Sequence, residues 1–183
     1  YKQQPTIVNN VETLCAAALI AVRGGDWYRS LGTLKSSGTK ILSVAGDVAR
    51  PGLYEYPFGV TLRQVLEDCG AADTQAIQIS GPSGVCVRIA FEDLPTAGAF
   101  TVFDASRDMF DVARNYAQFF AHESCGFCTP CRVGTSMLVA SMDKIHAGNG
   151  TQHDVGEIDR LNKVLLMSAH CGLGHTACNP ILD

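Results

Sequence analysis

The sequence predicts an α+β fold in which a small strand-rich unit is followed by a helical region. Two observations support this prediction. Short segments rich in Ile, Leu, Val and Tyr, separated by Gly/Pro turns, lie between residues 41 and 89. From Asp104 onward, apolar side chains instead recur every three to four residues, which is the period of an amphipathic helix. We therefore predict three parts, at residues 1–36, 39–92 and 100–183.

The first part is predicted to be helical. In "PTIVNNVETLCAAALIAVRGG" either Asn9 or Asn10 can cap a helix, because a short amide side chain can accept a backbone N–H of the first turn. Glu12 favours the first turn through the helix dipole, and the glycines at 24 and 25 end the helix. Residues 34–40, "LKSSGTK", are predicted to form a linker.

The second part reads as two strands, a helix and further strands. Residues 41–44 predict a first strand, "GDVARPG" a turn and "LYEY" a second strand. Thr61 is predicted to cap a helix that runs through Asp68 and stops at Gly70. Strand-like residues then surround the "GPSG" turn at 81–84.

The third part is predicted to contain three helices. The first follows Asp104, and the inward-facing side chains expected on it are apolar: Met109, Phe110, Val112, Tyr116 and Phe119. The other two are expected over residues 131–147 and 155–169, joined by the short "HAGNG" turn. Two helices of similar length with a short connection pack antiparallel, so we expect a helical hairpin here.

Charge and hydropathy exclude several classes of function. The net charge is −4 and no long basic run is present, which argues against binding to nucleic acid or to an anionic membrane. The longest apolar stretch, residues 14–22, is too short to span a bilayer, so no direct membrane insertion is expected. The chain opens without an initiator methionine or a signal segment, which suggests a fragment of a longer cytoplasmic protein, either free or peripheral to a membrane complex.

Three of the eight cysteines form a C-x2-C-x2-C pattern at Cys125, Cys128 and Cys131. Thr129 can cap the helix that follows, with Pro130 at its first position. Because the second helix of the hairpin returns to the start of the first, Cys171 is expected to lie beside Cys131. The four thiols would then be neighbours in space.

A compact triplet with one distant cysteine favours a four-iron cubane, in which each iron takes one thiolate. Structural zinc more often uses two separated pairs of ligands, but His122, His170 or His175 could complete a Cys3His zinc site. A disulfide or an unliganded set is the remaining alternative. Cys178 is expected to be a bystander.

Four segments resemble one known family: "ESCGFCTPCRVG", "HCGLGHTACNP", "PTIVNNVETL" and "VAGDVARPGLYEYPFGVTLRQVLEDCG". The chain resembles the C-terminal part of the flavoprotein (FMN and 4Fe-4S) subunit of NADH dehydrogenase, the complex I 51 kDa type. It is most similar to the diaphorase large subunit of NAD-reducing bidirectional hydrogenases. Formate dehydrogenase flavoprotein subunits share these segments, so complex I or formate dehydrogenase remain alternative parents.

The resemblance implies a ubiquitin-like β-grasp (soluble-ligand-binding β-grasp) domain at 39–92 and a C-terminal helical bundle at 100–183. It implies that Cys125, Cys128, Cys131 and Cys171 hold a [4Fe-4S] cluster in this bundle. Residues 1–36 would be a helical remnant of the FMN-binding domain, in which Asn9 and Asn10 are candidate FMN contacts. A plain helix cap is the alternative role for these asparagines.

The resemblance also implies a function in electron transfer, from FMN reduced by NADH through the cluster to other iron-sulfur subunits of a diaphorase, hydrogenase or complex I assembly. No catalytic residue is expected in this chain. The family's glycine-rich nucleotide region is absent, so FMN and NAD(H) belong to the full-length parent and the isolated chain should be inactive with NADH. The rival prediction is a zinc-stabilised or docking module without redox activity.

Overall fold

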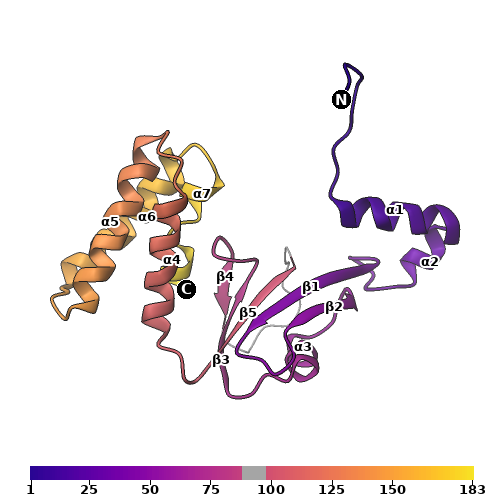
Figure 1. Ribbon diagram of the computed structural model, residues 1–183, viewed down its shortest axis with the longest axis horizontal. Helices are drawn as coiled ribbons and strands as arrows, with labels where there is room; N and C mark the ends of the chain where they lie inside the picture. The colour runs from indigo at the N-terminus through magenta and orange to yellow at the C-terminus, as the bar shows by residue number, and fades with distance from the viewer. Residues whose placement is uncertain (88–97) are drawn as a thin grey trace. The chain divides into compact units, whose positions relative to one another are not determined.

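The computed structural model describes residues 1–87 and 98–183, and helices precede and follow a five-stranded sheet in it (Figure 1). In chain order the elements are α1 (Val11–Arg23), α2 (Gly25–Arg29), β1 (Thr39–Gly46), β2 (Gly52–Pro57), α3 (Leu62–Cys69), β3 (Thr74–Ile79), β4 (Val85–Val87), β5 (Ala99–Asp104), α4 (Met109–Glu123), α5 (Thr129–His146), α6 (Gln152–Ser168), α7 (Gly172–His175) and α8 (Asn179–Leu182). The fold therefore combines helices with a β-sheet, which confirms this much of the α+β prediction. The predicted boundary at residue 92 lies outside the described residues.

The chain divides into two compact units, one of residues 1–41 and 55–60 and the other of residues 42–54 and 61–183. In the first unit, Asn10 caps α1, since its Oδ1 accepts the Glu12 N–H at 2.8 Å. The Glu12 carboxylate in turn accepts hydrogen bonds from Lys40 Nζ at 2.6 Å and from the Ile41 N–H at 2.9 Å. These donors, Lys40 first, lower the pKa of Glu12 and tie α1 to the start of β1.

The sheet has the strand order β2-β1-β5-β3-β4. Strands β1 and β5 pair in parallel, from Ser43 opposite Ala99 to Gly46 opposite Val102. Strand β3 is antiparallel to both of its neighbours, β5 and β4. The middle strand of the sheet, β5, is therefore the last of the five in the sequence. Because β5 begins at Ala99, the sheet extends past the predicted range 39–92.

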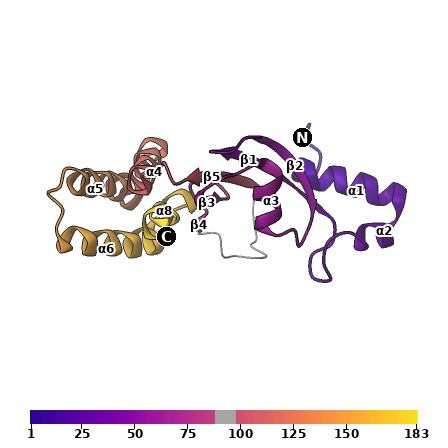
Figure 2. The ribbon, with the colours of Figure 1, turned by 90° about the horizontal axis from the view of Figure 1, so that it is seen from below.

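The predicted signals around α3 are present in the structure. Thr61 Oγ1 accepts the Gln64 N–H at 3.3 Å, and Gly70 ends the helix in the left-handed conformation with φ of 69°. Val65 and Leu66 are buried, as expected for the apolar stripe of a helix that covers a sheet. Figures 1 and 2 both show α3 beside the strands.

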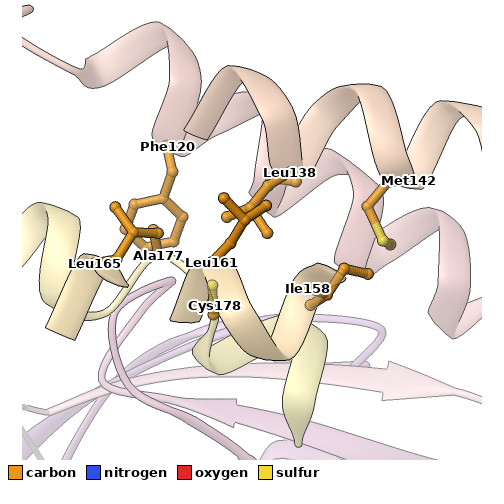
Figure 3. Close-up of a cluster of buried hydrophobic side chains, with 9 residues drawn as sticks. Phe120, Leu138, Met142, Ile158, Leu161, Leu165, Ala177 and Cys178 are labelled. Atoms are coloured by element: carbon orange, nitrogen blue, oxygen red, sulfur yellow. The ribbon is translucent and has the colours of Figure 1, made fainter. Parts of the chain in front are cut away.

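Helices α4, α5 and α6 share a hydrophobic core with the C-terminal segment (Figure 3). Its buried members are apolar: Ala117, Phe120, Leu138, Met142, Ile158, Leu161, Leu165, Ala177 and Cys178. The prediction that Phe119 faces inward is wrong, because this side chain is 42% exposed while Phe120 is buried. Phe110, Ala113, Ala117 and Phe120 follow the helical period and form the core-facing stripe instead.

The predicted hairpin of α5 and α6 is present, since the two helices pack against each other (Figure 2). Its turn is held by Asp154, whose carboxylate accepts hydrogen bonds from the backbone and side chain of Thr151 and from Lys144 Nζ. Lys144, followed by Thr151, holds the pKa of Asp154 well below its usual range. The end of α5 is thereby bonded to the start of α6.

No helix in the described part of the chain is long and apolar enough to cross a membrane.

Candidate metal centre

The cysteine loop, residues 124–131, connects α4 to α5. Ser124 is the last residue associated with α4, and Cys128 is the residue that precedes the first turn of α5. The prediction that Thr129 caps α5 is therefore wrong by one position: Thr129 is the first helical residue, and Pro130 follows it within the first turn. Gly126 has φ of 76°, a left-handed conformation that glycine adopts without steric strain.

Cys131 lies in the first turn of α5 and is 5% exposed. Its Sγ is 3.3 Å from Ser124 Oγ. On another side it faces α7, where a Cβ added to Gly174 would lie 3.4 Å from Cys131 Cβ and 3.6 Å from its Sγ. The segment after α6 thus packs directly against the first turn of α5, which is the arrangement that the hairpin prediction requires.

Cys128 makes the second link between these segments. The backbone N–H groups of His170 and Cys131, that of His170 first, lower the pKa of the Cys128 thiol. The thiol also stands at the N-terminus of an 18-residue helix, where the helix dipole favours negative charge. The local chemistry at Cys128 therefore favours the thiolate, which is the form that binds metal.

Cys125 and Cys171 are both exposed. Cys171 directly follows His170, and its carbonyl accepts the His175 N–H at 3.2 Å at the start of α7. Cys125 lies between Ser124 and Gly126, which are joined by a Gly126 N–H to Ser124 Oγ contact of 3.4 Å. The structure thus brings the two cysteine-bearing segments together, with Cys131 buried, Cys128 half-buried, and Cys125 and Cys171 at the surface.

Arg132 stabilises the cysteine loop through hydrogen bonds from its side chain. Its guanidinium donates to the Gly126 carbonyl at 2.5 Å and to Thr129 Oγ1 at 3.5 Å. Sequence reasoning missed Arg132, together with Ser124 and Gly174. Their adjacency to the cysteines in the sequence was a weak signal, because only the folded structure shows which of these neighbours point toward the thiols.

The histidines that could complete a zinc site have other partners. The side chain of His122 is 87% exposed and lies 4.0 Å from Glu123 Oε1. The ring of His170 packs edge-on against Phe127, with centroids 5.2 Å apart. His175 Nε2 lies 2.8 Å from the carbonyl oxygen of Ala169. Each of these three histidine rings therefore contacts a group other than a cysteine thiol.

The donor set is compatible with an iron-sulfur cubane. Each iron of a cubane takes one thiolate, and the four cysteines on two adjoining segments supply that number of ligands. Within residues 1–87 and 98–183, no group of three or more His, Cys, Asp or Glu side chains is already arranged around a single position that could hold a metal ion.

Cys178 has a different environment from the four cysteines of the candidate site. Cys178 is 1% exposed within the helical core, and burial raises the pKa of its thiol to about 12. A thiol in that environment resists ionisation and behaves as a small apolar side chain. This setting agrees with the expectation that Cys178 is a bystander.

Two family models match the chain. Residues 111–183 match the NADH-ubiquinone oxidoreductase-F iron-sulfur binding region, and residues 41–85 match the SLBB domain. The first match contains all four cysteines of the candidate site, and the second contains most of β1 and all of β2, α3 and β3.

Curated proteins and solved structures give the same result. The alpha subunit of the NAD-reducing hydrogenase HoxS of Cupriavidus necator is 45% identical, over 100% of this chain and 32% of that subunit. The F subunit of NADH-quinone oxidoreductase of Escherichia coli is 37% identical, over 96% of this chain and 42% of that protein. A crystal structure of an NAD+-reducing [NiFe]-hydrogenase in the H2-reduced state matches all of this chain and 34% of its own, with a TM-score of 0.90 and 45% identity.

These matches do not favour a zinc-stabilised or docking module. The chain spans about a third of the length of the hydrogenase subunit that it matches. The chain therefore contains an SLBB domain and an NADH-ubiquinone oxidoreductase-F iron-sulfur binding region, and it is homologous to part of the alpha subunit of the NAD-reducing hydrogenase and to part of the F subunit of NADH-quinone oxidoreductase.

Proposed function

We propose that Cys125, Cys128, Cys131 and Cys171 hold a [4Fe-4S] cluster and that this chain carries electrons within an NAD(H)-dependent oxidoreductase. One observation carries the proposal: the segment that follows Cys171 lies against the first turn of α5, through the close approach of Gly174 to Cys131. A cluster bound there would accept and release single electrons.

The protein's part in this function is to bind and surround the cluster. The N-terminus of α5 and the backbone donors around Cys128 stabilise negative charge on sulfur. The inward position of Cys131 excludes water from one side of the site, while Cys125 and Cys171 lie at the surface. A site with one side at the surface can exchange electrons with a neighbouring redox group.

For the parent protein we propose an NADH-reduced FMN that supplies the electrons and iron-sulfur subunits of a hydrogenase, diaphorase or complex I assembly that receive them. The names of the relatives, an NAD-reducing hydrogenase and an NADH-quinone oxidoreductase, support this proposal. Asn10 is engaged as the cap of α1, so Asn9, which is exposed, is the freer candidate for an FMN contact. We place the protein in the cytoplasm, where clustered thiols stay reduced.

We also propose that the sheet and α3 form a β-grasp domain and that α4 to α8 form the cluster-binding bundle. The match of residues 41–85 to the SLBB domain and the shared core of the helical region support this division. The domain boundaries predicted from the sequence are residues 1–36, 39–92 and 100–183. The last range begins within β5, which is a strand of the sheet.

Cluster binding can be tested by anaerobic reconstitution of the full chain with iron and sulfide. We expect about four irons and four sulfides per chain, broad visible absorption, and an EPR signal after reduction with dithionite. Replacement of any of the four cysteines by Ala should abolish or strongly reduce the signal. Cys178→Ala and Cys15→Ala serve as controls that should leave it unchanged. Stoichiometric zinc without colour would instead support the zinc-stabilised module.

Because the nucleotide and flavin sites are proposed to lie in the rest of the parent protein, the chain alone should not oxidise NADH. The reconstituted chain should be reduced by dithionite but should not reduce an artificial acceptor with NADH, because hydride transfer requires a bound flavin. Adding the rest of the parent subunit should restore that activity. NADH oxidation by the purified chain, with free flavin removed, would contradict the proposal that the nucleotide site lies elsewhere.

A further inference from the structure

Ser124 is the one hydroxyl within the cysteine loop that contacts a thiol among the described residues. Its Oγ lies 3.3 Å from the Sγ of Cys131, and either atom could be the donor when the thiol carries its proton. Coordination to iron removes that proton and leaves only lone pairs on sulfur. In a cluster-bound state the hydroxyl must therefore be the donor.

The direction of the Ser124 hydroxyl is supported by a second contact. The backbone N–H of Gly126 lies 3.4 Å from Ser124 Oγ, so it approaches a lone pair of this oxygen and leaves the hydroxyl hydrogen for Cys131. Gly126 is itself held by Arg132, which donates to its carbonyl oxygen. In this arrangement the Gly126 N–H donates to the Ser124 oxygen, and the Ser124 hydroxyl donates to the Cys131 sulfur.

The surroundings make this hydrogen bond strong. Cys131 is 5% exposed, and Ser124 is half-buried at the end of α4. Water therefore competes less for the sulfur than it would at the surface, and an electrostatic interaction is stronger in the lower local dielectric. A donor to a ligating sulfur stabilises whichever state of the cluster carries more negative charge, which is the state with one added electron.

We propose that Ser124 is a positioning residue whose hydroxyl, by donating to Cys131 Sγ, raises the reduction potential of the iron-sulfur cluster. This inference rests on the proposed function, since it requires a cluster bound to Cys131. The reaction is the addition of one electron to the cluster, with no bond broken. It sets how readily the cluster accepts an electron from the donor in the parent protein.

The test is a redox titration of the reconstituted full chain, with dithionite as reductant, mediator dyes, and EPR detection of the reduced cluster. We compare the wild-type chain with Ser124→Thr, which keeps the hydroxyl, and with Ser124→Val and Ser124→Ala, which lack it. Thr and Val have nearly the same shape, so their difference isolates the hydroxyl. Ser136→Ala is the control, because that exposed hydroxyl bonds to the Arg132 carbonyl instead of a thiol.

Loss of the hydroxyl should lower the equilibrium constant for reduction about tenfold, which is about 59 mV for a one-electron couple. Ser124→Thr and Ser136→Ala should titrate like the wild-type chain. Equal potentials for the Thr and Val variants would overturn the inference. So would a Val variant that assembles no cluster while the Thr variant does, because Ser124 would then serve assembly.

Iron and sulfide analysis of the wild-type chain separates this inference from the proposed function. If the wild-type chain binds no cluster, the proposed function fails. If it binds the cluster and the potentials do not depend on the hydroxyl, only the inference about Ser124 fails.

Discussion

Gly174 offers the sharpest test of how α7 fits against the cysteine loop. A Cβ at this position would lie 2.5 Å from the Cβ of Ala169, and 3.4 and 3.6 Å from the Cβ and Sγ of Cys131. Carbon atoms in contact normally lie about 3.5 to 4.0 Å apart, so Gly174→Ala requires a displacement of about 1 Å or more. Ala169 cannot yield by rotating a side chain, since its Cβ is fixed to the backbone. The backbone of α7 must move.

We expect this displacement to cost about 1 to 3 kcal/mol, the usual range for added volume in a packed site. The backbone conformation of Gly174 is not left-handed, so the cost arises from contact and not from strain in φ. Because α7 begins directly after Cys171, the displacement also moves that ligand relative to Cys131. Each 1.4 kcal/mol lost from ligand geometry corresponds to about tenfold weaker binding of the cluster.

Gly172→Ala is the matched control in the same short helix. A Cβ there would have no neighbour within 4 Å, and the conformation of Gly172 is likewise not left-handed. The assay is iron and sulfide content after reconstitution, together with the Tm of the chain with and without iron. Gly174→Ala should lose cluster content and Tm, and Gly172→Ala should keep both. Equal behaviour of the two variants would refute the reasoning that α7 positions Cys171 through this contact.

Three further predictions concern stability. Leu138 is fully buried in the helical core, so Leu138→Ala should cost about 2 to 5 kcal/mol in urea unfolding, whereas Met167→Ala, at an 87% exposed position, should cost little. The pKa of Asp154 is lowered in the folded state, so its contribution is fully present above its unfolded pKa of about 3.9 and is lost as pH falls toward the folded value. Unfolding of wild type and Asp154→Asn should therefore differ at pH 7 and converge at low pH, and an equal difference at both would contradict this. Leu66 is buried, so Leu66→Ala should lower the free energy of unfolding by about 2 to 5 kcal/mol. If the sheet and the helical region unfold separately, amide hydrogen exchange in this variant should become faster in the sheet before it does so in α5 and α6.

Local sequence determined the start of α1 and both ends of α3. Asn10 and Thr61 cap their helices with side chains that reach backbone groups two or three residues away, and Gly70 ends α3 as predicted. Such interactions depend on neighbours in the chain, so they can be read without knowing the fold. The spacing of the cysteines likewise indicated which four thiols to consider and that a helical hairpin could bring Cys171 near Cys131.

Tertiary packing decided the rest. The parallel pairing of β1 with β5 and the inward position of Phe120 in place of Phe119 depend on surfaces that come from distant parts of the chain. The same holds at the candidate site, where the contact of Ser124 with Cys131 and the fit of Gly174 against Cys131 arise from how α4, α5 and α7 meet. The residue types at these positions were visible in the sequence. Which of them touch a thiol is set by close packing between segments, because a shift of an ångström makes or removes such a contact.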